Sequence, residues 1–173
     1  IALDPRNAET FSNRGVVLHR LNRLDEAIAS HEHAVALDPQ RVEGRWNFSN
    51  ALLLNGDWSR GWQEFEWRWK HSELKLLARR KALLQPRWTG AEPLRGRTLL
   101  LQAEQGLGDT IQFCRYARLA TARGARVLLE VHAPLFGVLQ GLDGVAGLLT
   151  PKSPLPPFDI HCPLLSLPLA FDT

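Results

Sequence analysis

A short polar segment between an apolar run and a helical pattern carries the residues that could do chemistry in this chain. It reads Glu104-Gln105-Gly106-Leu107-Gly108-Asp109-Thr110. The run at 98–102 is typical of a buried strand, and residues 110–123 have helical periodicity. A glycine-bearing turn that opens a helix exposes backbone N–H groups at the positive end of the helix dipole, which favours an anion or a polar ligand. We therefore predict that the residues of this segment bind a substrate.

A further apolar run at 126–131 and two expected short strands at 145–149 and 158–161 alternate with helical or loop segments, which indicates a parallel βαβ sheet. Ligands bind such sheets outside the carboxyl ends of the strands. The segment 104–110 follows one strand, and His161 and Ser166 flank a proline-bearing turn at the carboxyl end of another, so we expect them to line one cleft. A structural reading stays open: the glycines permit a tight turn, Asp109 caps the helix and contributes about 0.5–2 kcal/mol, and a lone histidine is more often structural.

The first part of the chain repeats. Leu3-Asp4-Pro5 returns as Leu37-Asp38-Pro39, which is a period of about 34 residues typical of helical repeats. Residues 8–41 have small and apolar residues at helical spacing, namely Phe11, Gly15, Leu18, Leu24, Ala27, Ile28 and Ala34. With these residues the segment resembles one tetratricopeptide repeat, and Arg14 and His31 depart from the family pattern.

A second repeat at 42–69 keeps the register of the first. Its matching residues are Phe48, Leu52, Asn55-Gly56-Asp57, Gly61 and Phe65. Repeat arrays present a concave surface to peptides, so Asn13, Asn47 and Asn50 on the first helices are candidates to bind an extended peptide. A solvated helix face explains these polar residues equally well.

The expected domains are repeats at 1–70, a helical extension and linker at 71–93, and an α/β domain at 94–173. Pro86, Gly90, Pro93 and Gly96 punctuate the linker. Residues 1–7 read as the tail of a preceding repeat, and the chain contains no Met. We therefore expect it to be a piece of a longer protein.

Three strings in the second half have a family resemblance. They are Pro86-Arg87-Trp88-Thr89-Gly90, the segment from Glu104 to Phe113, and Phe158-Asp159-Ile160-His161 followed by Pro163-Leu164-Leu165-Ser166-Leu167-Pro168. They resemble bacterial proteins that join tetratricopeptide repeats to a glycosyltransferase-like domain. That domain is related to heptosyltransferases, whose GT-B fold has two Rossmann-like lobes.

The resemblance implies a fold class and a reaction. The fold is α plus α/β, with helical repeats followed by a Rossmann-like parallel-sheet lobe that is the N-terminal half of a GT-B fold. Gly108-Asp109 matches the pair in which the aspartate is regarded as the catalytic base of an inverting transfer. A nucleotide sugar would be the donor substrate, a protein or glycan the acceptor, and no separate cofactor is expected. The donor would bind mainly in a second lobe, so we expect these 173 residues to be inactive alone.

Composition limits the other classes. The chain is 45% hydrophobic and 23% charged with a net charge of +3, which is typical of a soluble globular protein and gives little reason to expect a nucleic-acid partner. No apolar run approaches the length of a membrane span, the histidines lack metal-type spacing, and the two cysteines are far apart, so a cytoplasmic protein without a metal is the default.

Two alternatives remain open. A non-catalytic protein interaction scaffold would use only the repeats. A dinucleotide-binding domain would use Gly106, Gly108 and Glu130, although Ile111 stands where the fingerprint has its third glycine.

Overall fold

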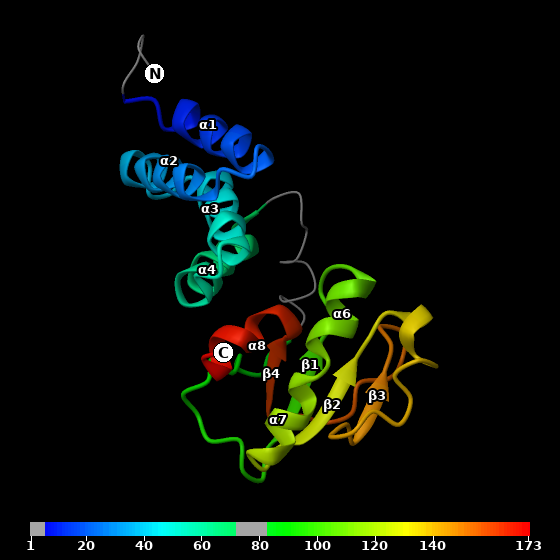
Figure 1. Cartoon of the computed structure of the whole chain (residues 1–173). Helices are drawn as coiled ribbons and strands as arrows, with labels where there is room; N and C mark the ends of the chain where they lie inside the picture. Colours follow the sequence, from blue (N-terminus) through cyan, green and yellow to red (C-terminus); the bar gives the residue numbers. More distant parts are fainter. Residues whose placement is uncertain (1–5, 72–82) are drawn as a thin grey trace. The chain divides into compact units, whose positions relative to one another are not determined.

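The computed structural model describes residues 6–71 and 83–173 (Figure 1). Residues 6–71 belong to one compact unit, and residues 83–172 belong to a second. The described part of the first unit is helical. The second unit contains a parallel sheet with helices. The predicted fold class, helices followed by an α/β sheet, is confirmed.

The first unit consists of two helix pairs. Helix α1 (Ala8–Arg20) packs against α2 (Leu24–Leu37), and α3 (Val42–Leu54) packs against α4 (Trp58–Phe65), which continues as the 3-10 turn η1 (Glu66–Lys70). Helix α2 also packs on α3, and α1 contacts α3. Each of the two predicted repeats is therefore one helix pair.

Small residues and side-chain caps explain the helix pairs. Ala27, Ala34 and Ala51 are buried almost completely, so neighbouring helices can approach closely. The Asn7 side chain accepts a hydrogen bond from the Thr10 N–H at 2.9 Å and begins α1. A cap of this kind stabilises a helix by about 0.5–2 kcal/mol.

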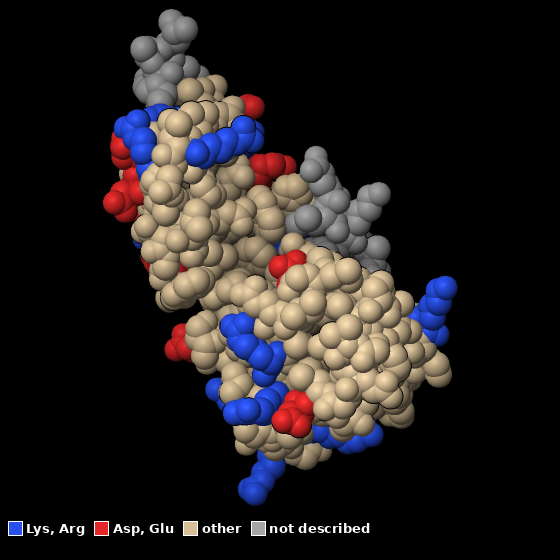
Figure 2. Space-filling model, turned by 45° about the vertical axis from the view of Figure 1, so that its right-hand side comes forward, with Lys and Arg blue, Asp and Glu red and all other residues tan. Residues whose placement is uncertain are grey.

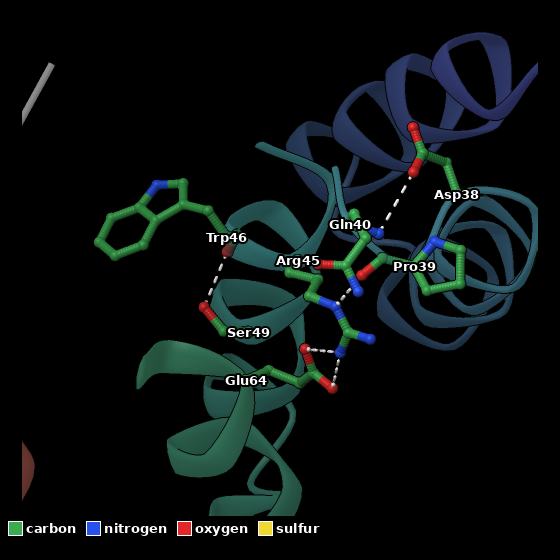
Figure 3. Close-up of polar contacts among 7 residues, drawn as sticks. All are labelled: Asp38, Pro39, Gln40, Arg45, Trp46, Ser49 and Glu64. Atoms are coloured by element: carbon green, nitrogen blue, oxygen red, sulfur yellow. Dashed lines mark hydrogen bonds and ion pairs between the residues drawn. The ribbon is translucent and has the colours of Figure 1, made fainter. Parts of the chain in front are cut away.

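The turn between the repeats is held by Arg45 of α3 (Figure 3). Its Nη1 donates to both carboxylate oxygens of Glu64 on α4 at 2.8 Å, and its Nε donates to the carbonyl of Pro39 at 2.6 Å. Asp38 Oδ1 accepts from the N–H of Gln40 at 3.2 Å. The Asp-Pro pair that marks the repeat in the sequence is thus fixed to both helices of the next repeat.

In the second unit the strands are β1 (Thr98–Gln102), β2 (Arg126–Glu130), β3 (Gly147–Leu149) and β4 (Ile160–Pro163). All pair in parallel, in the order β3-β2-β1-β4. This is the order of the first four strands of a doubly wound Rossmann fold, in which the strand order reverses next to the first strand.

Helices α6 (Leu107–Phe113) and α7 (Tyr116–Ala122) run back across one face of this sheet (Figure 1). The predicted single helix at 110–123 thus begins earlier and is broken at 114–115. Leu100 and Leu128 pack with Phe158, Leu83 and Leu149. The remaining short elements are η3 (Ala133–Leu135), η4 (Leu164–Ser166) and α8 (Leu167–Phe171).

Part of the expected linker packs in the second unit. The Trp88 N–H donates to the His161 carbonyl at 2.8 Å, and the His161 N–H donates to the Pro86 carbonyl at 3.1 Å, which extends the sheet beyond β4. The Trp88 side chain is 1% exposed and lies against Phe171. Residues 83–93 therefore pack with the sheet, whereas 72–82 lie outside the described residues.

Candidate active site at the carboxyl edge of the sheet

The strand order places the candidate site at the carboxyl ends of β1 and β4. The strand order reverses between these two strands, and in doubly wound sheets the ligand crevice lies at this point. The segment 103–106 leaves β1 here, and η4 follows β4 directly. Glu104 joins the two segments, because its Oε1 accepts a hydrogen bond from the Leu165 N–H at 2.9 Å.

Asp109 lies in the first turn of α6 and is partly exposed. Its Oδ2 accepts a hydrogen bond from the Gly106 N–H at 2.9 Å, so it caps the helix. This is half of a capping box, since Gly106 has no side chain to return the bond. No described group bonds Oδ1 of Asp109. One carboxylate oxygen is therefore fixed, and the other can accept a proton or a hydrogen bond.

The two glycines of the turn are not required by its backbone conformation. Gly106 has φ −81°, and Gly108 is not among the glycines with positive φ. A Cβ at Gly108 would meet no described atom within 4 Å. Among the described residues, no group accepts from the N–H groups of Leu107 and Gly108. A ligand can therefore approach the backbone of this turn closely.

Thr110 connects this turn to the end of β2. Its side chain is 1% exposed, and Oγ1 lies 3.1 Å from the Gly106 carbonyl and 3.2 Å from Nδ1 of His132. Gln105, on the same turn, has a buried Nε2 for which the described residues supply no acceptor. His132 is not among the site residues expected from the sequence. Its only signal in the sequence is its position directly after an apolar strand.

His161 and Ser166 do not line an open cleft as expected. Their residues are 4% and 2% exposed. The strand at 158–161 was expected to end at His161, but β4 runs from Ile160 to Pro163, where Cys162 and Pro163 pair with the end of β1. His161 therefore lies inside the strand, and Ser166 is buried in η4.

The asparagines of the repeats are only partly brought together. Asn47 and Asn50 line a cavity of about 440 Å³. The other lining residues are Val16, His19, Arg20 and Leu54, so α1 and α3 both contribute. Asn13 is exposed and is not part of the lining.

The geometry of α6 differs from a dinucleotide fingerprint. Ile111, at the position of the third glycine, is 51% exposed. In the fingerprint this position lets the helix approach the strand. Here it faces solvent, which disfavours the dinucleotide alternative.

On the face in Figure 2, Lys and Arg are scattered, with Asp and Glu between them, and do not form one basic stripe.

Within ranges 6–71 and 83–173, no helix has the length and apolar character needed to cross a membrane. The same residues contain no group of three or more His, Cys, Asp or Glu that could hold a metal ion.

Fold and site together define a helical-repeat protein with a Rossmann-like parallel sheet and a polar turn at its switch point. No family model matches the chain. Protein FlbA of Caulobacter vibrioides is 32% identical over 117 residues, which cover 65% of this chain and 19% of FlbA. The chain thus spans about a fifth of the length of this curated relative.

Among solved structures, a mutant of the Thermobaculum terrenum O-GlcNAc transferase is similar over 86% of this chain and 35% of its own. The sequence identity is 16% and the TM-score is 0.40.

Proposed function

We propose that this chain is part of a glycosyltransferase-like protein that transfers a sugar from a nucleotide-sugar donor to a protein or glycan acceptor. The observation that carries the proposal is the position of Asp109. It lies on the glycine-bearing turn at the β1/β4 switch point, with Oδ2 fixed by the Gly106 N–H and Oδ1 bonded by no described group. The residues Glu104 to Phe113 are also those that resemble the glycosyltransferase-like family.

The proposed reaction is the one that the family resemblance implies, with Oδ1 of Asp109 as the proton acceptor. The acceptor hydroxyl oxygen forms a bond to the anomeric carbon, and the bond from that carbon to the nucleoside diphosphate breaks with inversion. The hydroxyl proton passes to Oδ1 of Asp109, and the nucleoside diphosphate leaves with the bonding electron pair. A positioned general base of this kind contributes about 10²–10⁴ in rate. The donor is a substrate, and the proposal includes no separate cofactor.

The approachable turn would hold polar groups of a substrate. The unbonded N–H groups of Leu107 and Gly108 are donors, and the buried Gln105 Nε2 is a third donor close in sequence. Glu104 acts differently, because its carboxylate ties the end of β1 to η4 at 2.9 Å. We assign Glu104 to holding the two sides of the crevice together.

The repeats are proposed to bind a protein partner, and we place the complete protein in the cytoplasm. The cavity at Asn47 and Asn50 supports the first part, because two amide side chains with both donors and acceptors lie at one hollow between α1 and α3. A non-catalytic interaction scaffold is the second candidate function, favoured by the same cavity.

The first experiment uses the protein from the native reading frame that contains this chain. It is incubated with a panel of UDP-, GDP- and ADP-linked sugars and arrays of peptides and oligosaccharides. Consumption of one donor, with a product of inverted anomeric configuration by NMR, is the expected result. If no donor is consumed while the protein is folded, the enzyme proposal is wrong, and the result supports the non-catalytic interaction scaffold.

The repeats are tested with a peptide array. Asn47→Ala and Asn50→Ala should reduce capture of bound peptides, whereas Asn13→Ala should not, since Asn13 lies outside the cavity. Equal loss in all three variants, or no loss in any, would contradict the assignment of this cavity.

A further inference from the structure

The contact between Thr110 and His132 determines which nitrogen of the imidazole carries the proton. The Thr110 hydroxyl has one hydrogen. The Gly106 carbonyl, 3.1 Å away, can only accept it, so the hydroxyl donates to that carbonyl. With its one hydrogen directed at that carbonyl, the hydroxyl oxygen accepts from His132 Nδ1, which lies 3.2 Å away. The neutral imidazole therefore carries its proton on Nδ1, and Nε2 has a lone pair.

The environment of His132 leaves this lone pair accessible. The residue is partly exposed and lies two residues after the end of β2, at the same edge of the sheet as the start of α6. No described group bonds Nε2, and this atom is not among the buried side-chain atoms that lack a partner. Nε2 therefore reaches solvent beside the turn that carries Asp109.

The tautomer is held by a rigid framework. Thr110 is buried, and its N–H and hydroxyl both donate to the Gly106 carbonyl. The ladder between β1 and β2 continues one residue past β1, because the Ala103 N–H donates to the Glu130 carbonyl at 2.9 Å. The segments that lead from β1 to Thr110 and from β2 to His132 thus both begin at hydrogen-bonded strand ends.

We propose that His132 Nε2 is a hydrogen-bond acceptor for a hydroxyl of a carbohydrate ligand at the carboxyl edge of the sheet, with Thr110 holding the required tautomer. The choice of a carbohydrate rests on the proposed function. The tautomer itself does not, since it is inferred from the two contacts of the Thr110 hydroxyl.

The experiment is nitrogen-15 NMR of the imidazole groups in the whole chain. The chain has six histidines, and the loss of one set of signals in His132→Gln assigns His132. The expected wild-type spectrum shows a protonated Nδ1 and an unprotonated Nε2. Thr110→Val, which removes only the hydroxyl from a similar shape, should shift His132 toward the Nε2–H tautomer, and Thr110→Ser should restore the wild-type pattern.

Thr121→Val is the matched control. Thr121 is also a helical threonine whose hydroxyl donates to a backbone carbonyl, that of Gly144 at 2.7 Å, and it has no contact with His132. This variant should leave the His132 signals unchanged. A wild-type Nε2–H tautomer, or a Thr110→Val spectrum identical to wild type, would overturn the proposal.

The ligand part is tested by titrating methyl glycosides of glucose, galactose and N-acetylglucosamine. At least one should move the unprotonated Nε2 signal, whereas 2-methoxytetrahydropyran, a related ring without hydroxyls, should not. If no glycoside moves the signal, or if the control ring moves it equally, the acceptor role is wrong. If the protein shows the expected tautomer and sugar response but transfers no sugar, only the proposed function is wrong. If the protein transfers sugar but His132 is the Nε2–H tautomer, only this inference is wrong.

Discussion

Gly15→Ala should lower the stability of the first unit, although a change from glycine to alanine inside a helix ordinarily raises stability. Gly15 lies in α1, and a Cβ built there would lie 2.5 Å from Cε1 of His31 and 2.7 Å from both ring nitrogens. His31, on α2, is fully buried and therefore cannot withdraw to solvent. The ring occupies the space that an alanine methyl group would need.

The magnitude follows from two opposing effects. Alanine in place of a helical glycine stabilises by about 0.5–1 kcal/mol, whereas forced overpacking of a core costs about 1–3 kcal/mol. Gly44 is the matched control, because it is also a buried helical glycine, but its added Cβ would have only ordinary contacts at 3.8 Å with Arg41. Gly44→Ala should stabilise, and Gly15→Ala should be less stable than Gly44→Ala by about 1–3 kcal/mol.

The assay is urea unfolding followed by tryptophan fluorescence and far-ultraviolet circular dichroism. Five of the six tryptophans are in the first unit, so fluorescence reports mainly on the repeats. The double variant with His31→Ala should recover part of the loss, since the methyl group then has room. If Gly15→Ala stabilises as much as Gly44→Ala, the packing of His31 over Gly15 is refuted.

Three further outcomes are expected. Burial, with a smaller contribution from His19, lowers the pKa of His31 from 6.5 to about 4. The unfolded chain thus binds a proton that the folded chain excludes, so the unfolding free energy should fall by up to about 3 kcal/mol between pH 6.5 and 4. His31→Phe should remove this pH-dependent loss when the variant and the wild type are unfolded in urea across that range. Gly90→Ala should destabilise the second unit far more than Gly96→Ala in thermal unfolding. Both glycines have positive φ, but only the Cβ at Gly90 would clash with a carbonyl of α8, that of Ala170. Asp109→Ala should lower stability by about 0.5–2 kcal/mol through loss of the cap, and Asp109→Asn by less, because its amide oxygen can still accept; equal losses on urea unfolding would contradict the cap.

The repeat and the switch-point turn could be predicted from sequence because both are local. The 34-residue period and small residues such as Ala27 and Ala34 follow from helix contacts within one chain segment. The turn at 104–110 is set by an apolar strand and a helix start next to each other. The break at Cys114 and Arg115 in the helix predicted at 110–123 was missed, since both flanking segments continue the helical pattern.

The features that could not be predicted from the sequence depend on contacts between residues that are distant in the chain. The end of β4 is set by its pairing with β1, about sixty residues earlier, so His161 was placed at a strand end although it lies within the strand. The pairing of residues 86–88 with β4 is a similar distant contact. His132 was missed because its partner Thr110 is 22 residues away, and the two meet only through the pairing of neighbouring strands.

The central claim is that Asp109 accepts a proton in sugar transfer while it caps α6. The most direct measurement is the transfer rate of the native-frame protein with Asp109→Asn, which keeps a cap acceptor and removes the base. Asp143→Asn, in an exposed loop away from the turn, is the control. The account predicts a loss of about 10²-fold or more for Asp109→Asn with unfolding close to wild type, and no loss for the control. A folded Asp109→Asn variant that transfers sugar at the wild-type rate would contradict it.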